Sequence, residues 1–267
     1  MDVGSLLAPA AEFADRLSQI KAGLAPTSDW YPYSTIQNVS HLDCLLTGSH
    51  RDLLGLTGGH PVADIGAADG DMAFFLGDLG VAVDIIDHAP TNWNGLRGAR
   101  MLAGHFGPSM PVTVHDVDLD SQFLMPREWY GLVLLLGILY HLQNPFYALR
   151  HLAGRSEYLL MSTRVVRVTS DGKVRLDDAP VAYLVDPTET NGDSTNYWMF
   201  SMPGLRRLIS RTGWTVVDEM TVGHTGGDSD PSRPDRDERA FYLLRSRSAP
   251  APVEQSGVMG GGRVAAP

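Results

Sequence analysis

The middle of the chain alternates between short apolar runs and longer stretches whose apolar side chains recur with helical spacing. The runs have the length of buried strands, and the stretches have the length of amphipathic helices. Strands are predicted at 62–65, 81–86, 111–115, 131–136 and 157–163, and helices at 70–79, 95–105 and 144–153. This alternation is typical of an α/β fold in which helices cover both faces of a mostly parallel sheet.

The two ends of the chain differ from this middle block. An amphipathic stretch from 6 to 24 and a second one from about 40 to 56 predict an N-terminal helical segment over residues 1–56. The core would then run from 57 to 164. Residues 248–267 are mostly Ala, Pro, Gly and Val, and we expect them to form a disordered tail.

The core is predicted to resume after an insertion. Ser201 is expected to begin a helix that reaches about Thr212. Two late apolar segments, 214–222 and 239–246, predict an antiparallel pair of strands. Residues 201–247 therefore belong to the core and complete a seven-stranded sheet.

The insertion itself spans residues 165–200. Its first part, VVRVTSDGKVRL, alternates apolar and polar positions around Asp171-Gly172, which predicts a β-hairpin. The part from 178 to 200 is rich in Pro, Asp, Asn and aromatic residues. We expect the whole insertion to form a cap on the core.

A glycine-rich turn, VADIGAADGD at 62–71, follows the first predicted strand. A dinucleotide-binding fingerprint that starts at Gly66 needs glycines where Ala68 and Asp71 stand. The charges of Asp69 and Asp71 would also oppose a pyrophosphate at close range. The sequence therefore argues against a turn that binds a dinucleotide.

The same turn suits S-adenosylmethionine, a nucleoside with a sulfonium and an ammonium group and no phosphate. The expected pattern is an acid followed by small residues at alternate positions, and it is matched by Asp64, Gly66, Ala68 and Gly70. The two glycines let the backbone approach the ligand without a Cβ in the way. We expect Asp64 to hold the ammonium group.

Two further acids stand where neighbouring strands are predicted to end. Asp87 ends the second strand, where a carboxylate can accept hydrogen bonds from both ribose hydroxyls. Asp116 ends the third strand, where it is expected to accept from the adenine amino group. Acids at three successive strand ends predict a cofactor site for S-adenosylmethionine.

Several longer motifs carry a resemblance to a known family. They are the aromatic Trp30-Tyr31-Pro32-Tyr33, GILYHLQNP at 137–145, TNYWMFSMPGL at 195–205, and Arg239. With the glycine turn, they make the chain resemble class I S-adenosylmethionine-dependent methyltransferases over about 60–165 and the late strands. More narrowly, the chain is similar to the bacterial tRNA wobble-uridine carboxymethyltransferases.

The resemblance implies a Rossmann-like methyltransferase fold with S-adenosylmethionine as cofactor. It places Gly137 in the cofactor site, and Tyr140 and Arg239 beside the extra carboxylate of the family's cofactor or beside the substrate. The chain departs from the family because WYPYSTIQN lacks the lysine expected in the aromatic motif. We therefore expect ordinary S-adenosylmethionine and O-methylation of a small molecule or sugar.

Charge also bears on the acceptor. The net charge of −10 makes nucleic acid an unfavourable partner. A tRNA substrate remains an alternative that predicts a basic stripe from Arg97, Arg100, Arg206, Arg207 and Arg211. A non-catalytic nucleoside-binding protein is the other alternative.

The candidate catalytic and substrate residues follow from their place in the chain. His141 lies just past the fourth strand, where it either acts as a general base or is hydrogen-bonded to a neighbouring loop. Tyr140 is expected to touch cofactor or substrate. The acceptor pocket is expected to be lined by Tyr183, Asn196, Tyr197 and Trp198, whose alternative role is to pack the cap onto the sheet. The resemblance adds Arg239 to the substrate residues.

Composition bears on the expected cellular compartment and on metal binding. A lone cysteine, Cys44, suits a reducing compartment, and the N-terminus has no secretory pattern, so we expect a cytoplasmic protein. The longest apolar run, 131–140, is too short to span a bilayer. The scattered histidines form no metal-ligand pair, and we expect no metal site.

Overall fold

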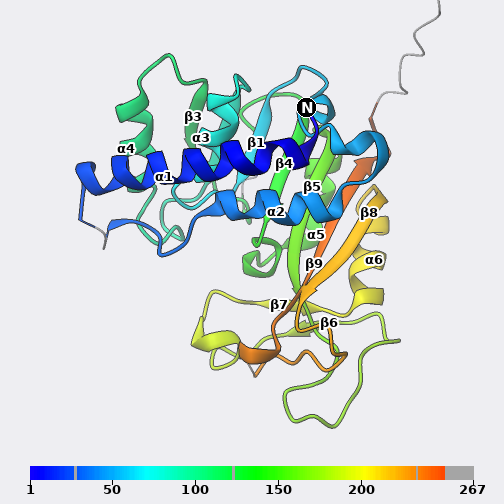
Figure 1. Ribbon diagram of the computed structural model, residues 1–267. Coiled ribbons are helices and arrows are strands. Elements are labelled where there is room, and N and C mark those ends of the chain that lie inside the picture. Colours follow the sequence, from blue (N-terminus) through cyan, green and yellow to red (C-terminus); the bar gives the residue numbers. More distant parts are fainter. Residues whose placement is uncertain (27–28, 122–123, 233, 250–267) are drawn as a thin grey trace, which may run out of the picture.

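The computed structural model describes residues 1–26, 29–121, 124–232 and 234–249. Within these residues the chain forms one sheet with helices on both faces, so the α/β fold with a mostly parallel sheet is confirmed (Figure 1). The expected disordered tail lies, from residue 250 onward, outside the described residues.

The parallel part of the sheet has the strand order β3-β2-β1-β4-β5. The five strands are β1 (Val62–Ile65), β2 (Val83–Asp87), β3 (Val112–Asp116), β4 (Tyr130–Leu136) and β5 (Ser156–Val165). Because they are parallel, their carboxyl ends meet at one edge of the sheet. Polar side chains at these ends are therefore brought together, as a ligand site in this kind of sheet requires.

The late strands complete the sheet as the sequence predicts. The strand β9 (Glu238–Ser246) pairs antiparallel with β5, and β8 (Trp214–Gly223) pairs antiparallel with β9. Two short strands that the sequence does not predict, β6 (Ala182–Leu184) and β7 (Trp198–Phe200), bring the described strands to nine. They extend the sheet from the end of β5 into the cap.

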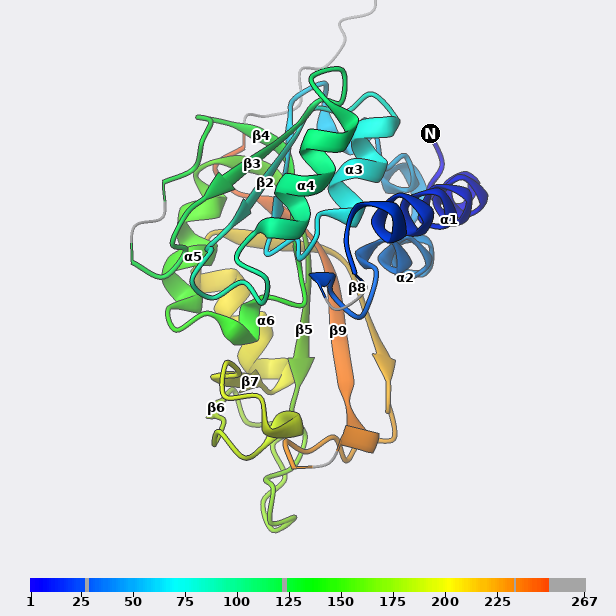
Figure 2. The same cartoon turned by 90° about the vertical axis from the view of Figure 1, so that its left-hand side faces the viewer.

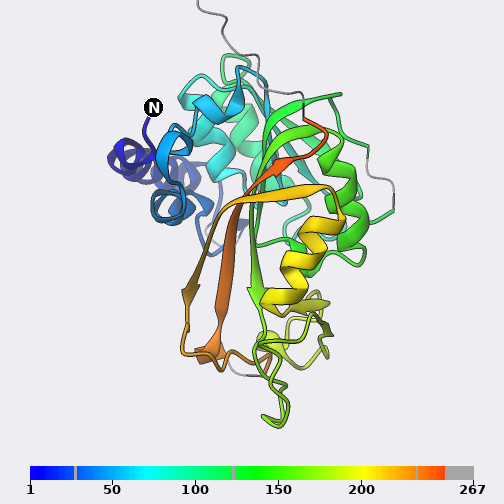
Figure 3. The ribbon, with the colours of Figure 1, turned by 90° about the vertical axis from the view of Figure 1, so that its right-hand side faces the viewer.

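The helices divide unequally between the two faces (Figures 2 and 3). One face carries α1 (Leu7–Leu24), α2 (Asn38–Leu45), α3 (Asp71–Asp78) and α4 (Arg97–Phe106), and the other carries α5 (Pro145–Ala153) and α6 (Met202–Arg211). Each face buries its own apolar cluster against the sheet. The residues of β4 from 130 to 135 contribute to both clusters and are fully buried.

The helix α1 buries one apolar stripe, as its spacing predicts. Ala10, Phe13 and Leu17 are buried, and the Phe13 ring lies 5.7 Å from that of Phe75 on α3. Burial of such an aromatic side chain contributes roughly 2–3 kcal/mol. The first helix is therefore packed onto the core.

The second predicted helix is shorter than the sequence indicates, because α2 ends at Leu45 and not near Leu56. At Thr47 the chain is already extended, and both its backbone N–H and its hydroxyl donate to the Asp218 carboxylate on β8. Two 3-10 turns, Gly48–Arg51 and Gly55–Thr57, replace the rest of the helix. A long-range hydrogen bond therefore outweighs local helix propensity here.

The predicted hairpin around Asp171-Gly172 is reduced to a turn. Val168 and Arg175 form an isolated bridge, and Thr169 N–H donates to the Val174 carbonyl at 3.0 Å. The preceding backbone donates instead to Ser229, since the N–H groups of Arg167 and Val168 both reach its carbonyl. Regular strands therefore do not form on either side of the turn.

In the described part of the chain, no helix has both the length and the apolar character that a bilayer crossing needs.

Candidate active site

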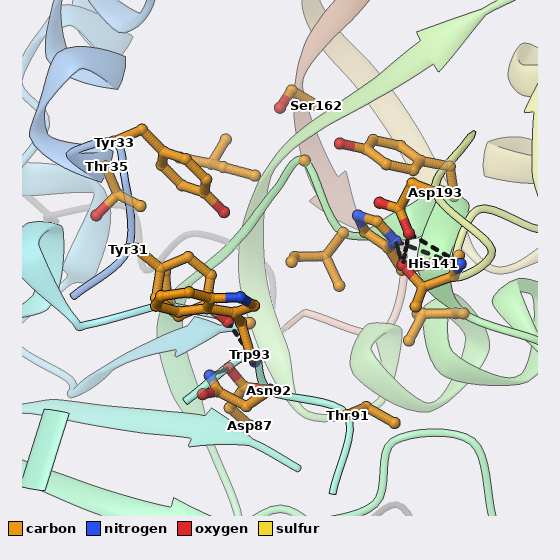
Figure 4. Close-up of a pocket in the computed structure, with 18 of the residues that line it drawn as sticks. Tyr31, Tyr33, Thr35, Asp87, Thr91, Asn92, Trp93, His141, Ser162 and Asp193 are labelled. Atoms are coloured by element: carbon orange, nitrogen blue, oxygen red, sulfur yellow. Dashed lines mark hydrogen bonds between the residues drawn. The ribbon is translucent and has the colours of Figure 1, made fainter. Parts of the chain in front are cut away.

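A cavity of about 1520 Å³ opens at the carboxyl ends of the parallel strands. Its walls come from the strand ends, from the segment 30–41 around the start of α2, and from the cap. Figure 4 shows Tyr31, Trp93 and Asp87 on one side of the cavity, and His141 and Asp193 on the other. The cavity therefore has two ends of different chemistry.

The glycine turn forms part of the cavity floor. Gly66 and Ala68 line the cavity, whereas Gly70 lies outside its lining and precedes α3. Gly66 has a φ of 65°, and a Cβ there would stand 2.2 Å from Cδ1 of Ile138. This turn therefore tolerates no side chain at Gly66 without movement of Ile138.

The acids inside the turn do not face the cavity. Lys21 on α1 lies 3.0 Å from the Asp69 carboxylate and 2.7 Å from that of Asp71, and all three side chains are largely buried. Asp69 also accepts from the backbone of Tyr31 at 2.9 Å. Lys21 therefore offsets one of these two negative charges, and neither carboxylate lines the cavity, so the turn repels a pyrophosphate less than the sequence indicates.

Asp64 lies behind the turn, where its carboxyl is buried and its Oδ2 atom has no hydrogen-bond partner. Burial, together with the charge of Asp87, raises its pKa to about 7. Asp64 does not line the cavity. Its expected contact with an ammonium group remains a prediction.

Asp87 and Asp116 end adjacent strands, but only Asp87 lines the cavity. The Asp87 carboxylate accepts from the backbone N–H of His88 and from the Asn92 amide, each at 2.8 Å, and burial raises its pKa. Asp116 accepts from the backbone of Ala89 at 2.9 Å and is close to half exposed. Asp116 therefore supports the loop after β2.

Asp118, two residues beyond Asp116, lines the cavity together with Leu119. Its carboxylate accepts from the backbone N–H groups of Asp120 and Ser121 at 2.9 and 3.3 Å. The sequence contains a hint of this role, since HDVDLD places another acid two residues after Asp116. Which of Asp116 and Asp118 reaches the cavity depends on where β3 ends, and the sequence does not give that residue.

Aromatic side chains cover the side of the cavity nearest Asp87. Tyr31 forms edge-on contacts with Tyr33 and Trp93, with ring centroids 5.5 Å apart in each pair. The Trp93 backbone N–H donates to the Tyr31 hydroxyl at 2.9 Å. Tyr33 and Trp93 are both more than half exposed. The aromatic motif singled out in the sequence therefore contributes to the site, with Trp93 as a partner that the sequence did not indicate.

Tyr140 and Arg239 lie together near Gly137, and all three line the cavity. The guanidinium of Arg239 lies 5.9 Å from the centre of the Tyr140 ring and 3.2 Å from the Asp237 carboxylate. A Cβ on Gly137 would stand 3.6 Å from both the Arg239 Nη1 and the Tyr140 hydroxyl. The motif at 137–145 and the start of β9 are thus adjacent in space.

His141 projects into the cavity from the turn after β4. Its Nδ1 lies 3.0 Å from the carbonyl oxygen of Thr195 and 3.0 Å from the Thr195 hydroxyl. Burial lowers its pKa, against the effects of the Thr195 hydrogen bond and the Asp193 charge. The hydrogen bond to a neighbouring loop is therefore present, and it leaves Nε2 available to the cavity.

The other candidate substrate residues have different surroundings. Tyr197 lines the cavity, and its hydroxyl accepts from the Gln143 amide at 3.3 Å. Tyr183 does not line it, and its hydroxyl is bonded within the cap to Ser170 and Glu189. Asn196 is buried outside the cavity lining and donates to Thr190. Of these three residues, only Tyr197 is brought into the cavity.

Neither the protein-family models nor the curated proteins match this sequence. Solved structures do match its fold. The [4+2]-cyclase SpnF has 17% identity over 82% of this chain and 87% of its own, with a TM-score of 0.55. An S-adenosylmethionine-dependent methyltransferase from Mesorhizobium loti has 16% identity over 73% of this chain and 94% of its own, with a TM-score of 0.51.

The N-terminal domain of EvdMO1, crystallised in the presence of SAH and D-fucose, also matches. It has 16% identity over 74% of this chain and 81% of its own, with a TM-score of 0.52. At these identities the similarity concerns the fold alone. The chain therefore has the Rossmann-like fold of S-adenosylmethionine-dependent methyltransferases.

Proposed function

We propose that this protein is an S-adenosylmethionine-dependent methyltransferase that methylates a hydroxyl group of a small molecule. The observation that carries the proposal is the two-ended cavity, with Asp87 near one end and His141 at the other. Its volume of about 1520 Å³ exceeds the roughly 300–1,000 Å³ typical of a pocket for one small ligand. A cofactor and an acceptor fit there side by side.

The residues near Asp87 suit a nucleoside with a cationic group. An ionised carboxylate only accepts hydrogen bonds, so Asp87 matches the two donor hydroxyls of a ribose. Asp118 offers a second acceptor for the adenine amino group. Both acids oppose a diphosphate. The case against a dinucleotide therefore rests mainly on these two cavity carboxylates and less on the acids of the glycine turn. Gly66 supplies the close backbone approach.

The chain's own residues would align the reaction and exclude water. When bound, S-adenosylmethionine supplies an electrophilic methyl group that an acceptor attacks in line with the breaking carbon–sulfur bond. Holding two reactants in such a geometry supplies much of the acceleration. Tyr140 and Arg239 would contact cofactor or acceptor beside His141, and His141 would accept the hydroxyl proton.

Charge favours a small acceptor over tRNA. Arg97 and Arg100 lie on α4 and the other three arginines of the expected stripe lie on α6, on the opposite face of the sheet. Arg97, Arg100 and Arg206 each pair with a carboxylate. None of the five lines the cavity. This arrangement supports a small-molecule acceptor.

Parallel calorimetric titrations with S-adenosylmethionine, S-adenosylhomocysteine and NAD test the cofactor. We expect the two sulfur nucleosides to bind and Asp87→Ala to weaken them at least tenfold, as for a lost hydrogen bond to a charged group. Asp78→Ala, which removes an exposed acid of α3, is the matched control. Binding of NAD without binding of the sulfur nucleosides would overturn the proposal.

Transfer of a labelled methyl group to a panel of sugars and phenols tests the reaction. D-fucose is the first acceptor to try, since it was present with the similar EvdMO1 domain. A non-catalytic nucleoside-binding protein would instead bind the cofactor and keep its function when Tyr140 and His141 are both replaced.

A further inference from the structure

The cap places a chain of hydrogen bonds behind His141, formed by Asp193 and Thr195. The Thr195 hydroxyl lies 2.6 Å from Oδ1 of Asp193, and the Thr195 backbone N–H donates to the same oxygen at 2.9 Å. His141 Nδ1 then lies 3.0 Å from both the hydroxyl and the carbonyl oxygen of Thr195. All three residues line the cavity.

These contacts determine which ring nitrogen carries the proton. A carbonyl oxygen only accepts, and a carboxylate only accepts, so the Thr195 hydroxyl must donate its hydrogen to Asp193. The hydroxyl then presents a lone pair to His141. With two acceptors facing it, Nδ1 must be the protonated nitrogen, and Nε2 keeps a free lone pair.

We propose that Asp193 and Thr195 are positioning residues that hold His141 in the tautomer whose unprotonated Nε2 faces the acceptor. This inference rests on the proposed function for the identity of the reaction. The tautomer itself is a property of the protein alone, so it can be measured without substrate.

The arrangement defines the step at the acceptor. As the hydroxyl oxygen bonds to the methyl carbon, the carbon–sulfur electron pair stays on sulfur and the hydroxyl proton passes to Nε2. The resulting imidazolium is stabilised by the Asp193 carboxylate, and its proton is later released to solvent. An acceptor that is already a good nucleophile, such as a neutral amine, would not need this base.

The other charges around His141 make Asp193 necessary. Burial lowers the pKa of the imidazole, and Arg239 and Arg164 act in the same direction. The Tyr140 ring lies tilted beside it, with ring centroids 4.3 Å apart. Burial acts to raise the pKa of Asp193, but the hydrogen bonds from Thr195 outweigh it and keep the pKa low. Asp193 is thus an anion that interacts with both the imidazole and Arg164.

The cap contains a matched control. Asp186 and Thr188 form the same turn, with the Thr188 hydroxyl 2.7 Å and its backbone N–H 2.9 Å from Oδ1 of Asp186. Neither residue lines the cavity. The same local geometry thus occurs beside the imidazole and also away from the cavity.

The experiment is a long-range ¹H–¹⁵N spectrum of the histidine rings in the full chain, with the His141 signals assigned from His141→Gln. We expect Nδ1 to be protonated and Nε2 unprotonated. Asp193→Ala frees the Thr195 hydroxyl to donate, and the tautomer ratio should shift by about fivefold, as for one lost hydrogen bond. Asp193→Asn should keep the tautomer and lower the imidazole pKa, and Asp186→Ala should change neither.

A wild-type His141 protonated on Nε2, or an equal shift in Asp186→Ala and Asp193→Ala, would overturn the inference. If Asp193→Ala does not fold, the pKa of the His141 imidazole in Asp193→Asn tests the role of Asp193. An unchanged imidazole pKa would contradict that role. Calorimetry with S-adenosylmethionine on the same samples separates the two hypotheses. Absent binding rejects the proposed function, whereas the tautomer result stands independently of it.

Discussion

Asp87 and Asp116 are paired residues at the ends of β2 and β3, yet their carboxylates serve different purposes. Asp87 lines the cavity, whereas Asp116 holds the backbone of Ala89 and lies 3.8 Å from Arg100. After the neighbouring strand β3, the acid that lines the cavity is therefore Asp118. In the proposed function, the nucleoside would contact the end of β2 and the loop that follows β3.

Asp118→Ala should weaken S-adenosylmethionine binding about tenfold or more, because a hydrogen bond to a charged acceptor contributes roughly 1.5–3 kcal/mol. Asp116→Ala should change binding less than about threefold, as for a substitution away from the ligand, since Asp116 does not line the cavity and its hydrogen bond goes to the backbone of Ala89. Isothermal titration calorimetry on both variants measures the difference. A larger loss of affinity in Asp116→Ala than in Asp118→Ala would indicate that Asp116 makes the adenine contact.

Lys21→Met should destabilise the fold by about 3–5 kcal/mol, because it leaves Asp69 and Asp71 buried without their cation. Arg16→Met on the same helix removes a pair with Asp78 that is exposed on both sides, and it should cost at most about 1 kcal/mol. Urea unfolding followed by circular dichroism compares the two. Equal losses of unfolding free energy would mean that the pairing of Lys21 with Asp69 and Asp71 contributes no more than an exposed ion pair.

Gly131→Ala should be strongly destabilising, because its Cβ would stand 1.8 Å from the backbone carbonyl oxygen of Thr57. Backbone atoms cannot rotate away, so strand β4 or the turn before β1 must move, at a cost of roughly 2 kcal/mol or more. Gly104→Ala in α4 meets nothing within 4 Å and should stabilise by about 0.5–1 kcal/mol. Thermal unfolding of the two variants should thus give opposite shifts.

Stability should fall as the pH rises from about 4 to about 7, as far as Asp64 contributes. Its pKa is about 7 when folded, against a value of 3.8 for the free side chain. In this window the folded state therefore holds the proton that the unfolded state has lost, and ionisation favours unfolding. Asp64→Asn should be more stable than the wild type at pH 8, with the difference disappearing near pH 4. Denaturation at both pH values checks this, and a difference that grows toward low pH would contradict it.

The order of strands and helices was predictable because hydrophobic period is a local property of the chain. The β1–glycine turn–α3 unit and the Ser201 helix start illustrate this, and Ser201 indeed accepts from the N–H of Gly204 at 3.1 Å. The length of α2 was not predictable, since Asp218, far away in the sequence, ends it. The short strands β6 and β7 likewise depend on pairing with the end of β5.

The site was predictable where a residue's role follows from its place at a strand end, as the position of Asp87 in the cavity illustrates. It was not predictable where two segments meet in space. Tyr31 reaches Trp93, Lys21 reaches Asp69, and Thr195 reaches His141 only after the sheet has formed. The burial of Asp69 and Asp71 was not predictable either, because their partner Lys21 lies on α1.

The cap strands join the sheet through a single ladder pair, Val165 with Phe200. The insertion contributes Asp193, Thr195 and Tyr197 to the cavity, whereas Gly66 and Asp87 come from the parallel part of the sheet. If the proposed function holds, exchanging this insertion for one of different sequence should retain cofactor binding and change the acceptor. Such a division offers a direct route to engineered regioselectivity.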